Sequence, residues 1–290
     1  MARILAISSQ VARGHVGLSA ISPALQALGH EVVALPTILL SNHPGHPHAA
    51  GERVSPMLLD RMLDALDVND WLADIDGVIT GYLPSADHVG FAVRAVARVR
   101  AASPGLVYLC DAVLGDTSKG LYIAPEAAEA MRTLVAGADI VKGNAFELGW
   151  LARAEIGDVA GVSHAAAREG WRDVVATSVR GRGEGVLGNV WIVGDEPPAI
   201  VDVAERSGVP KGTGDLMAAL VLGHLPWLPQ PRNAAVRADV LARAVAALQQ
   251  VIEASIEHPG TTDELRLRSL WFAPEPMPSP GGTRNPERSR

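Results

Sequence analysis

Residues 212–225 read GTGDLMAALVLGHL, a glycine-rich turn that runs directly into an apolar stretch of helical length. The two glycines around Thr213 let backbone N–H groups approach an anion closely, and a helix that begins there adds a partial positive charge. Asp215 falls in the first turn, where its carboxylate can accept a proton from a substrate hydroxyl. The stretch therefore favours an anion hole beside a general base, which phosphoryl transfer to an alcohol requires. A plain helix cap is the alternative.

Upstream of this turn, short apolar runs alternate with longer amphipathic stretches, a pattern typical of a mostly parallel sheet with crossover helices. Right-handed crossovers place helices on both faces of such a sheet, so the predicted fold class is α/β. The expected strands are residues 3–7, 31–35, 77–80, 106–110, 140–141 and 173–177, followed by a more antiparallel pair at 184–193 and 199–203. The expected helices are residues 17–28, 55–65, 85–102, 125–136, 145–152, 164–169, 213–224 and 233–257.

The composition excludes several classes of protein. The chain has 290 residues, 48% of them hydrophobic, and a net charge of -7, which argues against nucleic-acid and membrane-surface binding. A lone cysteine, Cys110 at the end of an apolar strand, excludes an intramolecular disulfide and a thiolate metal cage, and we expect it to be a small buried hydrophobe. With no long uncharged apolar run and no signal-peptide pattern, we expect a cytoplasmic protein without a membrane span.

Two segments stand apart from this regular pattern. We expect residues 1–272 to form one domain, within which residues 41–54 (SNHPGHPHAAGERV) are too polar and too rich in glycine and proline to be core. Residues 273–290 carry five prolines and no apolar period, which predicts a disordered tail.

Six short motifs occur in an order that resembles the pyridoxal kinases of the ribokinase superfamily, over roughly residues 3–255. Most of them follow predicted strands, where a parallel sheet binds its ligands. The motifs are SSQVARGHVG at 8–17, SNH at 41–43, TGY at 80–82, CDAVLGD at 110–116, NAFE at 144–147 and GTGD at 212–215. Each is weak alone, but together they identify the chain as a member of that superfamily, with a ribokinase-like α/β fold.

The resemblance implies a catalytic group and a substrate side. Asp215 corresponds to the base that activates the acceptor alcohol, with Gly212, Thr213 and Gly214 forming the anion hole. The residues expected on the substrate side are Ser9, Val16, His43, Tyr82 and Asp215. Ser9 would hydrogen-bond the pyridine ring, Tyr82 would supply a flat wall, and His43 would close over the substrate from the 41–54 flap. A flap that excludes water limits wasteful ATP hydrolysis. A zinc site at His43, His46 and His48 is a poor alternative, because the loop offers no further ligand.

The resemblance also implies where the nucleotide and a divalent metal bind. The expected nucleotide-binding residues are Asp111, Lys142, Asn144, Glu147, Thr177, Ser178, Gly212 and Gly214. The expected Mg²⁺ ligands are Asp111, Asp116 and Glu147, since Mg²⁺ prefers carboxylate oxygens and retained waters. For Asp111 and Asp116, simple turn formation after a strand is the alternative.

The chain departs from the family pattern at several positions. Pro44 replaces a threonine of the flap, Ala112 replaces a proline, and Lys142-Gly143 stand where the family has Thr-Pro. The replaced threonine belongs to the monovalent-cation and phosphate region, so we hypothesise that the Lys142 ammonium takes the place of the monovalent ion. The alternative is that Lys142 faces solvent. Lys211, also unusual, either meets the γ-phosphate or lies outside the site.

The resulting expectation is ATP-dependent phosphorylation of the 5′-hydroxymethyl group of pyridoxal, pyridoxine or pyridoxamine. The alternatives are a kinase for hydroxymethylpyrimidine or another small alcohol, which the Pro44 change allows, and a catalytically weak vitamer-binding protein, which the Lys142-Gly143 change allows. ATP and Mg²⁺ are the expected cofactors, and the resemblance further suggests a homodimer.

Overall fold

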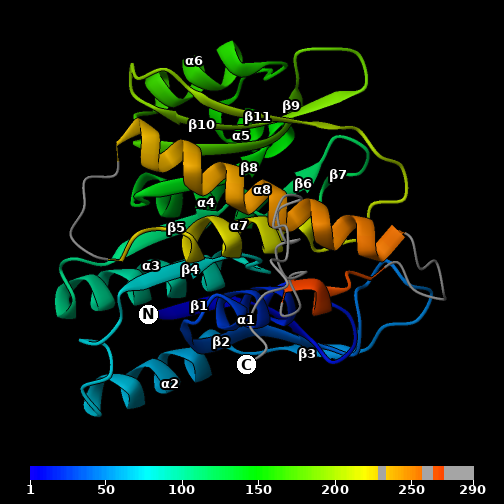
Figure 1. The fold of residues 1–290 in the computed structure, drawn as a ribbon. Helices are drawn as coiled ribbons and strands as arrows, with labels where there is room; N and C mark the ends of the chain where they lie inside the picture. The colour runs from blue at the N-terminus through cyan, green and yellow to red at the C-terminus, as the bar shows by residue number, and fades with distance from the viewer. Residues whose placement is uncertain (228–232, 257–263, 271–290) are drawn as a thin grey trace, which may run out of the picture.

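The chain folds around one large sheet in a computed structural model that describes residues 1–227, 233–256 and 264–270. Its strand order is β11-β10-β9-β8-β5-β4-β1-β2-β3 (Figure 1). The strands are β1 (Arg3–Val11), β2 (Glu31–Leu40), β3 (Gly51–Arg53), β4 (Gly77–Thr80), β5 (Val107–Asp111), β8 (Ile140–Asn144), β9 (Asp173–Arg180), β10 (Val186–Val193) and β11 (Ala199–Ala204). The short strands β6 (Gly115–Asp116) and β7 (Gly120–Leu121) form a separate hairpin.

The six strands from β9 to β2 pair in parallel, whereas β10, β11 and β3 add antiparallel edges. This confirms the predicted mostly parallel α/β sheet with an antiparallel pair after residue 184. In the centre, every residue of β4 and β5 is buried. Their mostly apolar sequences, GVIT and VYLCD, are typical of strands covered on both faces.

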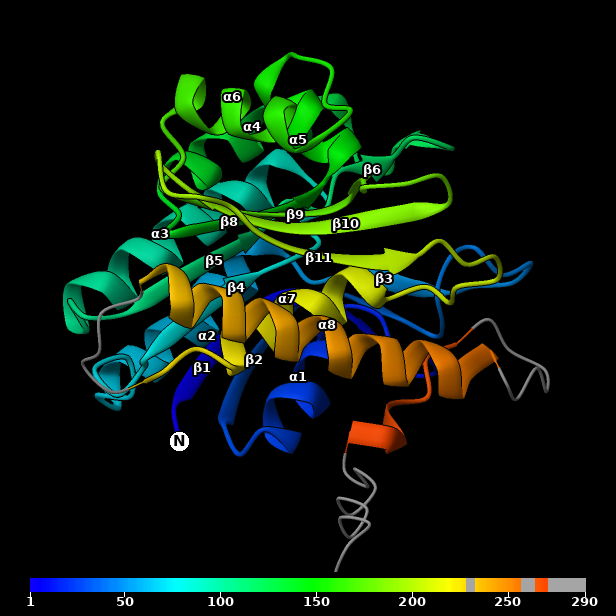
Figure 2. The same cartoon turned by 45° about the horizontal axis from the view of Figure 1, so that its top comes forward.

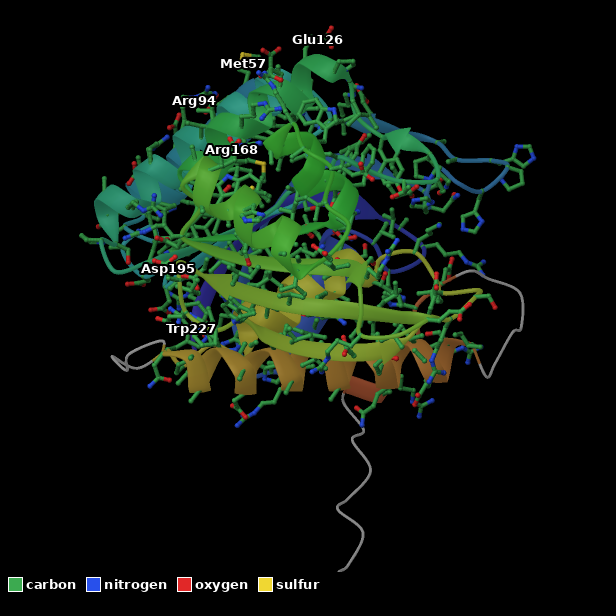
Figure 3. The ribbon with its side chains drawn as sticks, turned by 90° about the horizontal axis from the view of Figure 1, so that it is seen from above. Met57, Arg94, Glu126, Arg168, Asp195 and Trp227 are labelled. Carbon is green, nitrogen blue, oxygen red and sulfur yellow. The ribbon has the colours of Figure 1, made fainter. Side chains whose placement is uncertain are left out.

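Helices cover both faces of the sheet, as predicted. The helices are α1 (Leu18–Ala27), α2 (Pro56–Val68), α3 (Ala86–Ala102), α4 (Pro125–Ala136), α5 (Ala145–Ala152), α6 (Val159–Glu169), α7 (Thr213–Gly223) and α8 (Ala234–Ile256), with a 3₁₀ turn η1 (Leu267–Leu270). Helices α1, α7 and α8 and the turn η1 cover one face of the sheet, and α2 to α6 cover the other (Figures 1 and 2). The buried side chains of each group form a separate hydrophobic core. In Figure 3, Met57, Arg94, Glu126 and Arg168 mark the outer surface of the second layer.

Helix α7 is the most deeply buried helix of the first layer. All residues from Leu216 to Gly223 are buried, and the helix contacts α1 on one side and α8 on the other. This explains why its sequence is apolar all round rather than on one stripe. The N-terminus of α7, with the glycine turn, is thereby fixed at the carboxyl ends of the strands.

Several element boundaries extend beyond the predicted ones. Strand β1 continues from residue 7 to Val11, β2 from 35 to Leu40 and β9 from 177 to Arg180, because backbone pairing continues where the apolar pattern stops. The 41–54 flap, expected as a polar loop, contains β3, which pairs with the end of β2, and its residues are mostly exposed. The proposed tail at 273–290 lies outside the described residues.

No helix in the described part of the chain is both long enough and apolar enough to cross a membrane.

Candidate active site

The predicted site residues gather at the carboxyl ends of the parallel strands. Thr80 and Asp111 end β4 and β5, and Asn144 ends β8. The glycine turn at 212–215 reaches the same end of the sheet from the first helix layer. The loop between β1 and α1 packs directly against this turn.

Backbone conformation at the glycine turn requires glycine. Gly212 is the N-cap of α7 with φ 92°, and a Cβ built there would lie 1.9 Å from the carbonyl oxygen of His15. Gly17, at the start of α1, has φ 55°, and a Cβ there would lie 2.2 Å from the Ser9 carbonyl oxygen. The absence of a side chain at Gly212 therefore lets the glycine turn contact residue 15, and its absence at Gly17 lets the start of α1 pack against Ser9 of β1.

Asp215 lies in the first turn of α7, between the loops. Its carboxylate accepts a hydrogen bond from the backbone N–H of Gly17. The turn after β4 approaches the same carboxylate, because a Cβ on Gly81 would lie 3.7 Å from Asp215 Oδ1. Burial raises the pKa of Asp215, while the Gly17 N–H and the Lys142 ammonium lower it. An accessible carboxylate whose pKa is moved towards neutrality suits a general base.

Lys142 and Asp111 form a buried ion pair from neighbouring strands. The Lys142 Nζ lies 2.8 Å from Asp111 Oδ1, with side-chain exposures of 4% and 1%. Burial alone lowers the pKa of Lys142, but the nearby carboxylates of Asp111, Glu147 and Asp215 outweigh it, so the pKa is raised and the amine stays charged. Burial raises the pKa of Asp111 to about 6, although Lys142 opposes the shift. Both groups are therefore charged at neutral pH.

The Lys142 ammonium also reaches the glycine turn. A Cβ on Gly214 would lie 3.1 Å from Lys142 Nζ, so this cation stands against the backbone of the glycine turn. The structure therefore excludes the alternative in which Lys142 faces solvent. The Oδ2 oxygen of Asp111 is buried and has no hydrogen-bond partner among the described residues. An oxygen in that position is available to a ligand.

Glu147 and Asn144 form a capping box at the start of α5. The Asn144 side chain accepts from the Glu147 N–H at 2.9 Å, and Glu147 Oε2 accepts from the Asn144 N–H at 2.8 Å. The other carboxylate oxygen of Glu147 accepts from the N–H groups of Leu114, at 3.1 Å, and Gly115. Burial raises the pKa of Glu147 to about 8, against the opposing effect of Lys142. Glu147 thus joins the 112–116 loop to α5.

The Asp116 carboxylate forms a local turn. Its Oδ1 accepts three hydrogen bonds, from the N–H of Ser118, the hydroxyl of Ser118 and the N–H of Lys119, which close the β6–β7 turn. This is the turn geometry that the sequence left open as the alternative. In the described ranges, no three His, Cys, Asp or Glu residues are arranged to hold a metal ion. Asp111 Oδ2, which is buried without a hydrogen-bond partner in the described part of the chain, is a hard oxygen of the kind that Mg²⁺ takes, whereas both carboxylate oxygens of Glu147 accept backbone N–H groups.

The expected substrate side lies between β1, the turn after β4 and the flap. Ser9 is 8% exposed, whereas its neighbour Ser8 is fully buried and accepts the Tyr82 N–H at 3.0 Å. Thr37 donates to the Tyr82 carbonyl at 2.8 Å, so both backbone groups of Tyr82 are fixed. Ser8 and Thr37 were not singled out from the sequence, because each acts on a backbone group distant in the chain.

The flap contributes a small cavity beside this region. His43 Nδ1 accepts the Gly45 N–H at 3.0 Å, which shapes the flap turn. The cavity is lined by Arg13, Gly14, His15, Val16, His43, His46, Lys211 and Glu264. Val16 and His43 are therefore neighbours, as expected of residues on one side of the site. Lys211 borders the cavity beside the flap.

The other two expected nucleotide residues lie along β9. Thr177 pairs in register with Asn144, the last residue of β8. Ser178 is exposed and adopts a left-handed conformation with φ 55°, unusual for a residue with a side chain. Beyond them, the β9–β10 turn borders a second hollow lined by Arg180, Gly181, Gly183, Glu184, Gly185, Val186, Leu187 and Glu205.

Known proteins resemble this chain over nearly its full length. A pyridoxal kinase PdxY of Leifsonia xyli is 32% identical over 271 residues, covering 91% of this chain and 93% of that protein. This chain belongs to the pyridoxal kinase family. A pyridoxal kinase PdxY of Corynebacterium diphtheriae is 34% identical over 255 residues, covering 86% of the chain and 88% of that protein. No family model matches the sequence.

Solved pyridoxal kinases share the fold. The enzyme of Leishmania donovani in complex with ADP and pyridoxamine aligns with a TM-score of 0.84 at 31% identity, covering 94% of this chain and 95% of that one. The enzyme of Entamoeba histolytica aligns with a TM-score of 0.82 at 25% identity, covering 94% and 95%. The ribokinase-like α/β fold expected of a pyridoxal kinase is confirmed.

Proposed function

We propose that this protein is a pyridoxal kinase that transfers the γ-phosphoryl group of ATP to the 5′-hydroxyl of a B6 vitamer. The observation that carries the proposal is the meeting of three groups at the start of α7. These are the backbone of the glycine turn, the Asp215 carboxylate and the Lys142 ammonium. Kinases of the same family bind ADP together with pyridoxamine or pyridoxine. Together these support both the phosphoryl donor and the acceptor.

In the proposed reaction, Asp215 accepts the proton of the acceptor hydroxyl as its oxygen attacks the γ-phosphorus in line. The new O–P bond forms while the bond to the leaving ADP oxygen breaks. Negative charge on the transferred phosphoryl oxygens is stabilised by N–H groups of residues 212–214 and by Lys142. Because α7 is buried from Leu216 to Gly223, the position of its first turn is fixed before substrate binds.

A magnesium ion would be held by Asp111 through its free Oδ2, with Glu147 orienting waters, and would neutralise phosphate charge. Asp116 contributes to the same loop but has committed one carboxylate oxygen to its turn. The nucleotide would extend over Asn144, Thr177 and Ser178. On the vitamer side, Ser9, Val16, Tyr82 and His43 border the space opposite the anion hole.

We also propose that Lys142 makes a monovalent cation unnecessary. Its charge is buried, paired with Asp111 at 2.8 Å and held against Gly214, so it is a fixed positive charge at the transfer site. Activity should therefore be the same with tetramethylammonium as with potassium or sodium as the counter-ion. Loss of activity on removing potassium and sodium would contradict this role.

The decisive test of function is Asp215→Asn, measured with ATP and each of pyridoxal, pyridoxine and pyridoxamine. We expect turnover to fall by about 10³-fold or more while vitamer affinity, measured by calorimetry, is retained. A wild-type protein that binds vitamers but phosphorylates none would instead be the vitamer-binding protein that the sequence left as an alternative.

A hydroxymethylpyrimidine kinase remains the second candidate, favoured by Pro44 in the flap, which removes a hydroxyl from the acceptor side. A putative phosphomethylpyrimidine kinase of Bacteroides thetaiotaomicron shares the fold at 22% identity and a TM-score of 0.82. A panel of purified alcohols separates the two candidates. Phosphorylation of the pyrimidine alcohol and of none of the three vitamers would overturn the first.

We further propose that the enzyme works in the cytoplasm as a homodimer, in line with the family resemblance. Light scattering coupled to size-exclusion chromatography would test the dimer, and a mass of one chain would contradict it.

A further inference from the structure

Glu264 lies far from the site in sequence but beside it in space. The segment 264–270 returns after α8 and ends in η1, which packs against both α8 and α1 (Figure 1). Leu265 and Leu267 are 1% and 2% exposed and belong to the core of the first helix layer. The N–H of Arg266 donates to the Ser255 hydroxyl at 2.8 Å, which fixes the segment to α8. The buried leucines and the hydrogen bond to Ser255 therefore hold the start of this segment in a fixed position.

From this anchored position Glu264 contacts both loops of the site. On the acceptor side, Arg13 Nε lies 3.4 Å from Glu264 Oε1, and a Cβ on Gly14 would lie 3.3 Å from the same oxygen. On the phosphoryl side, Glu264 forms an isolated parallel bridge with Lys211, directly before the glycine turn. The next residue, Leu265, continues this contact, because its Cδ1 would lie 3.2 Å from a Cβ on Gly212.

These contacts flank the place where the two loops meet. His15 and Gly212 touch through the His15 carbonyl, and Glu264 reaches Gly14 on one side of that contact and Lys211 on the other. The Glu264 side chain is only 19% exposed, and the basic groups of Arg13 and Lys211 border the same cavity. Glu264 therefore joins the two loops in different ways: its carboxylate pairs with Arg13 of the first loop, and its backbone bridges to Lys211 beside the second.

We propose that Glu264 is a positioning residue that holds the 13–16 loop against the glycine turn. The inference rests on the proposed function, in which the first loop borders the acceptor alcohol and the second receives the phosphoryl group. Phosphoryl transfer depends on the in-line alignment of these two partners, and a displacement of about 1 Å can cost about 10²-fold in rate. Glu264 acts through the two loops and does not itself touch the reacting atoms.

The test compares Glu264→Ala with Glu264→Gln and with a matched control, Glu31→Ala. Glu31 pairs with Arg3 at 2.7 Å at the opposite end of β1 and β2. We expect Glu264→Ala to lower kcat about tenfold with a smaller change in the KM for the vitamer, because alignment is lost while the ring contacts remain. Glu264→Gln keeps the shape and loses the charge, so it should recover part of kcat. Glu31→Ala should leave kcat unchanged.

Amide hydrogen exchange provides a readout that does not depend on activity. Loss of Glu264 should speed exchange at residues 12–17 and 211–216 and leave β4 and β5 unaffected. Arg13→Gln breaks the same ion pair from the side of the 13–16 loop. It should speed exchange at the same amides, so the test still works if Glu264→Ala is unstable. If kcat and exchange match wild type in the Glu264 and Arg13 variants, the positioning role is wrong. If wild type phosphorylates no vitamer, the proposed function is wrong, but the exchange result still tests whether Glu264 holds the two loops together.

Discussion

Removing the Lys142 ammonium tests the proposed site most directly, because the group forms a buried ion pair and is proposed to stabilise the transferred phosphoryl group. At the 2.8 Å separation from Asp111 Oδ1, an effective dielectric of 20 gives an attraction of about 6 kcal/mol. Desolvation of both ions offsets part of it, and breaking a buried pair from one side costs about 3–5 kcal/mol. Lys142→Met keeps the length of the side chain, so we expect a free energy of unfolding lower by about this amount.

The same substitution should lower turnover by about 10²–10³-fold, the usual cost of removing one group that stabilises transition-state charge. Urea unfolding followed by tryptophan fluorescence measures the first effect, and a coupled assay with saturating Mg-ATP and vitamer measures the second. The double variant Lys142→Met/Asp111→Asn separates them. It removes the unpaired Asp111 charge, so stability should recover in part, while turnover stays low because both side chains belong to the proposed site.

Lys142→Met should also move the pH profile in a defined direction. Burial raises the pKa of Asp215, and Lys142 is one of the groups that lower it. Without the ammonium the pKa of Asp215 rises further, so the base is protonated up to a higher pH and the acidic limb of kcat shifts upward. Turnover of Lys142→Met within about threefold of wild type, with an unshifted acidic limb, would refute the catalytic role of Lys142.

Two further predictions concern stability. Gly212→Ala should lower the free energy of unfolding by about 1–2 kcal/mol because of its φ of 92°, and further because its Cβ would lie 1.9 Å from the His15 carbonyl oxygen. Gly208→Ala, with φ 70° and no described atom within 4 Å of the added Cβ, should show only the backbone cost. Thermal melts that show equal losses of stability for the two variants would contradict this. Neutral His30 donates to the Gly223 carbonyl at 2.8 Å, and burial lowers the pKa of His30. The free energy of unfolding should therefore fall as the pH drops below about 6.5. The urea midpoints at pH 7.5 and 5.5 should differ less in His30→Gln than in wild type.

Much of the fold and of the site could be predicted from the sequence, because both depend on local patterns. Apolar runs of strand length marked β4 and β5, and the spacing of GTGD marked the start of α7. The expected proximity of Lys142 to the anion hole follows from a rule of parallel sheets, that the residues after neighbouring strands share one edge. The structure adds that this lysine is buried and paired with Asp111.

The remaining features depend on contacts that no local pattern encodes. Glu147 accepts backbone N–H groups some thirty residues away, at Leu114 and Gly115, in addition to capping its own helix. Ser8 fixes Tyr82 in the same way through a main-chain group. Strand β3 forms because its backbone pairs with β2, although its side chains are all exposed. Glu264 is separated from the loops it contacts by more than fifty residues, so only the folded chain shows its position.

The complete burial of α7 has a consequence for how this enzyme loses function. A helix whose residues from Leu216 to Gly223 lie inside the core cannot fray by itself, because its exposure would open the cores it shares with α1 and α8. The amide hydrogens of α7 from Leu216 onward should therefore exchange only as fast as the whole domain unfolds. Activity and the folded fraction should then decline together on heating, whereas the exposed flap can vary among relatives without weakening the phosphoryl end.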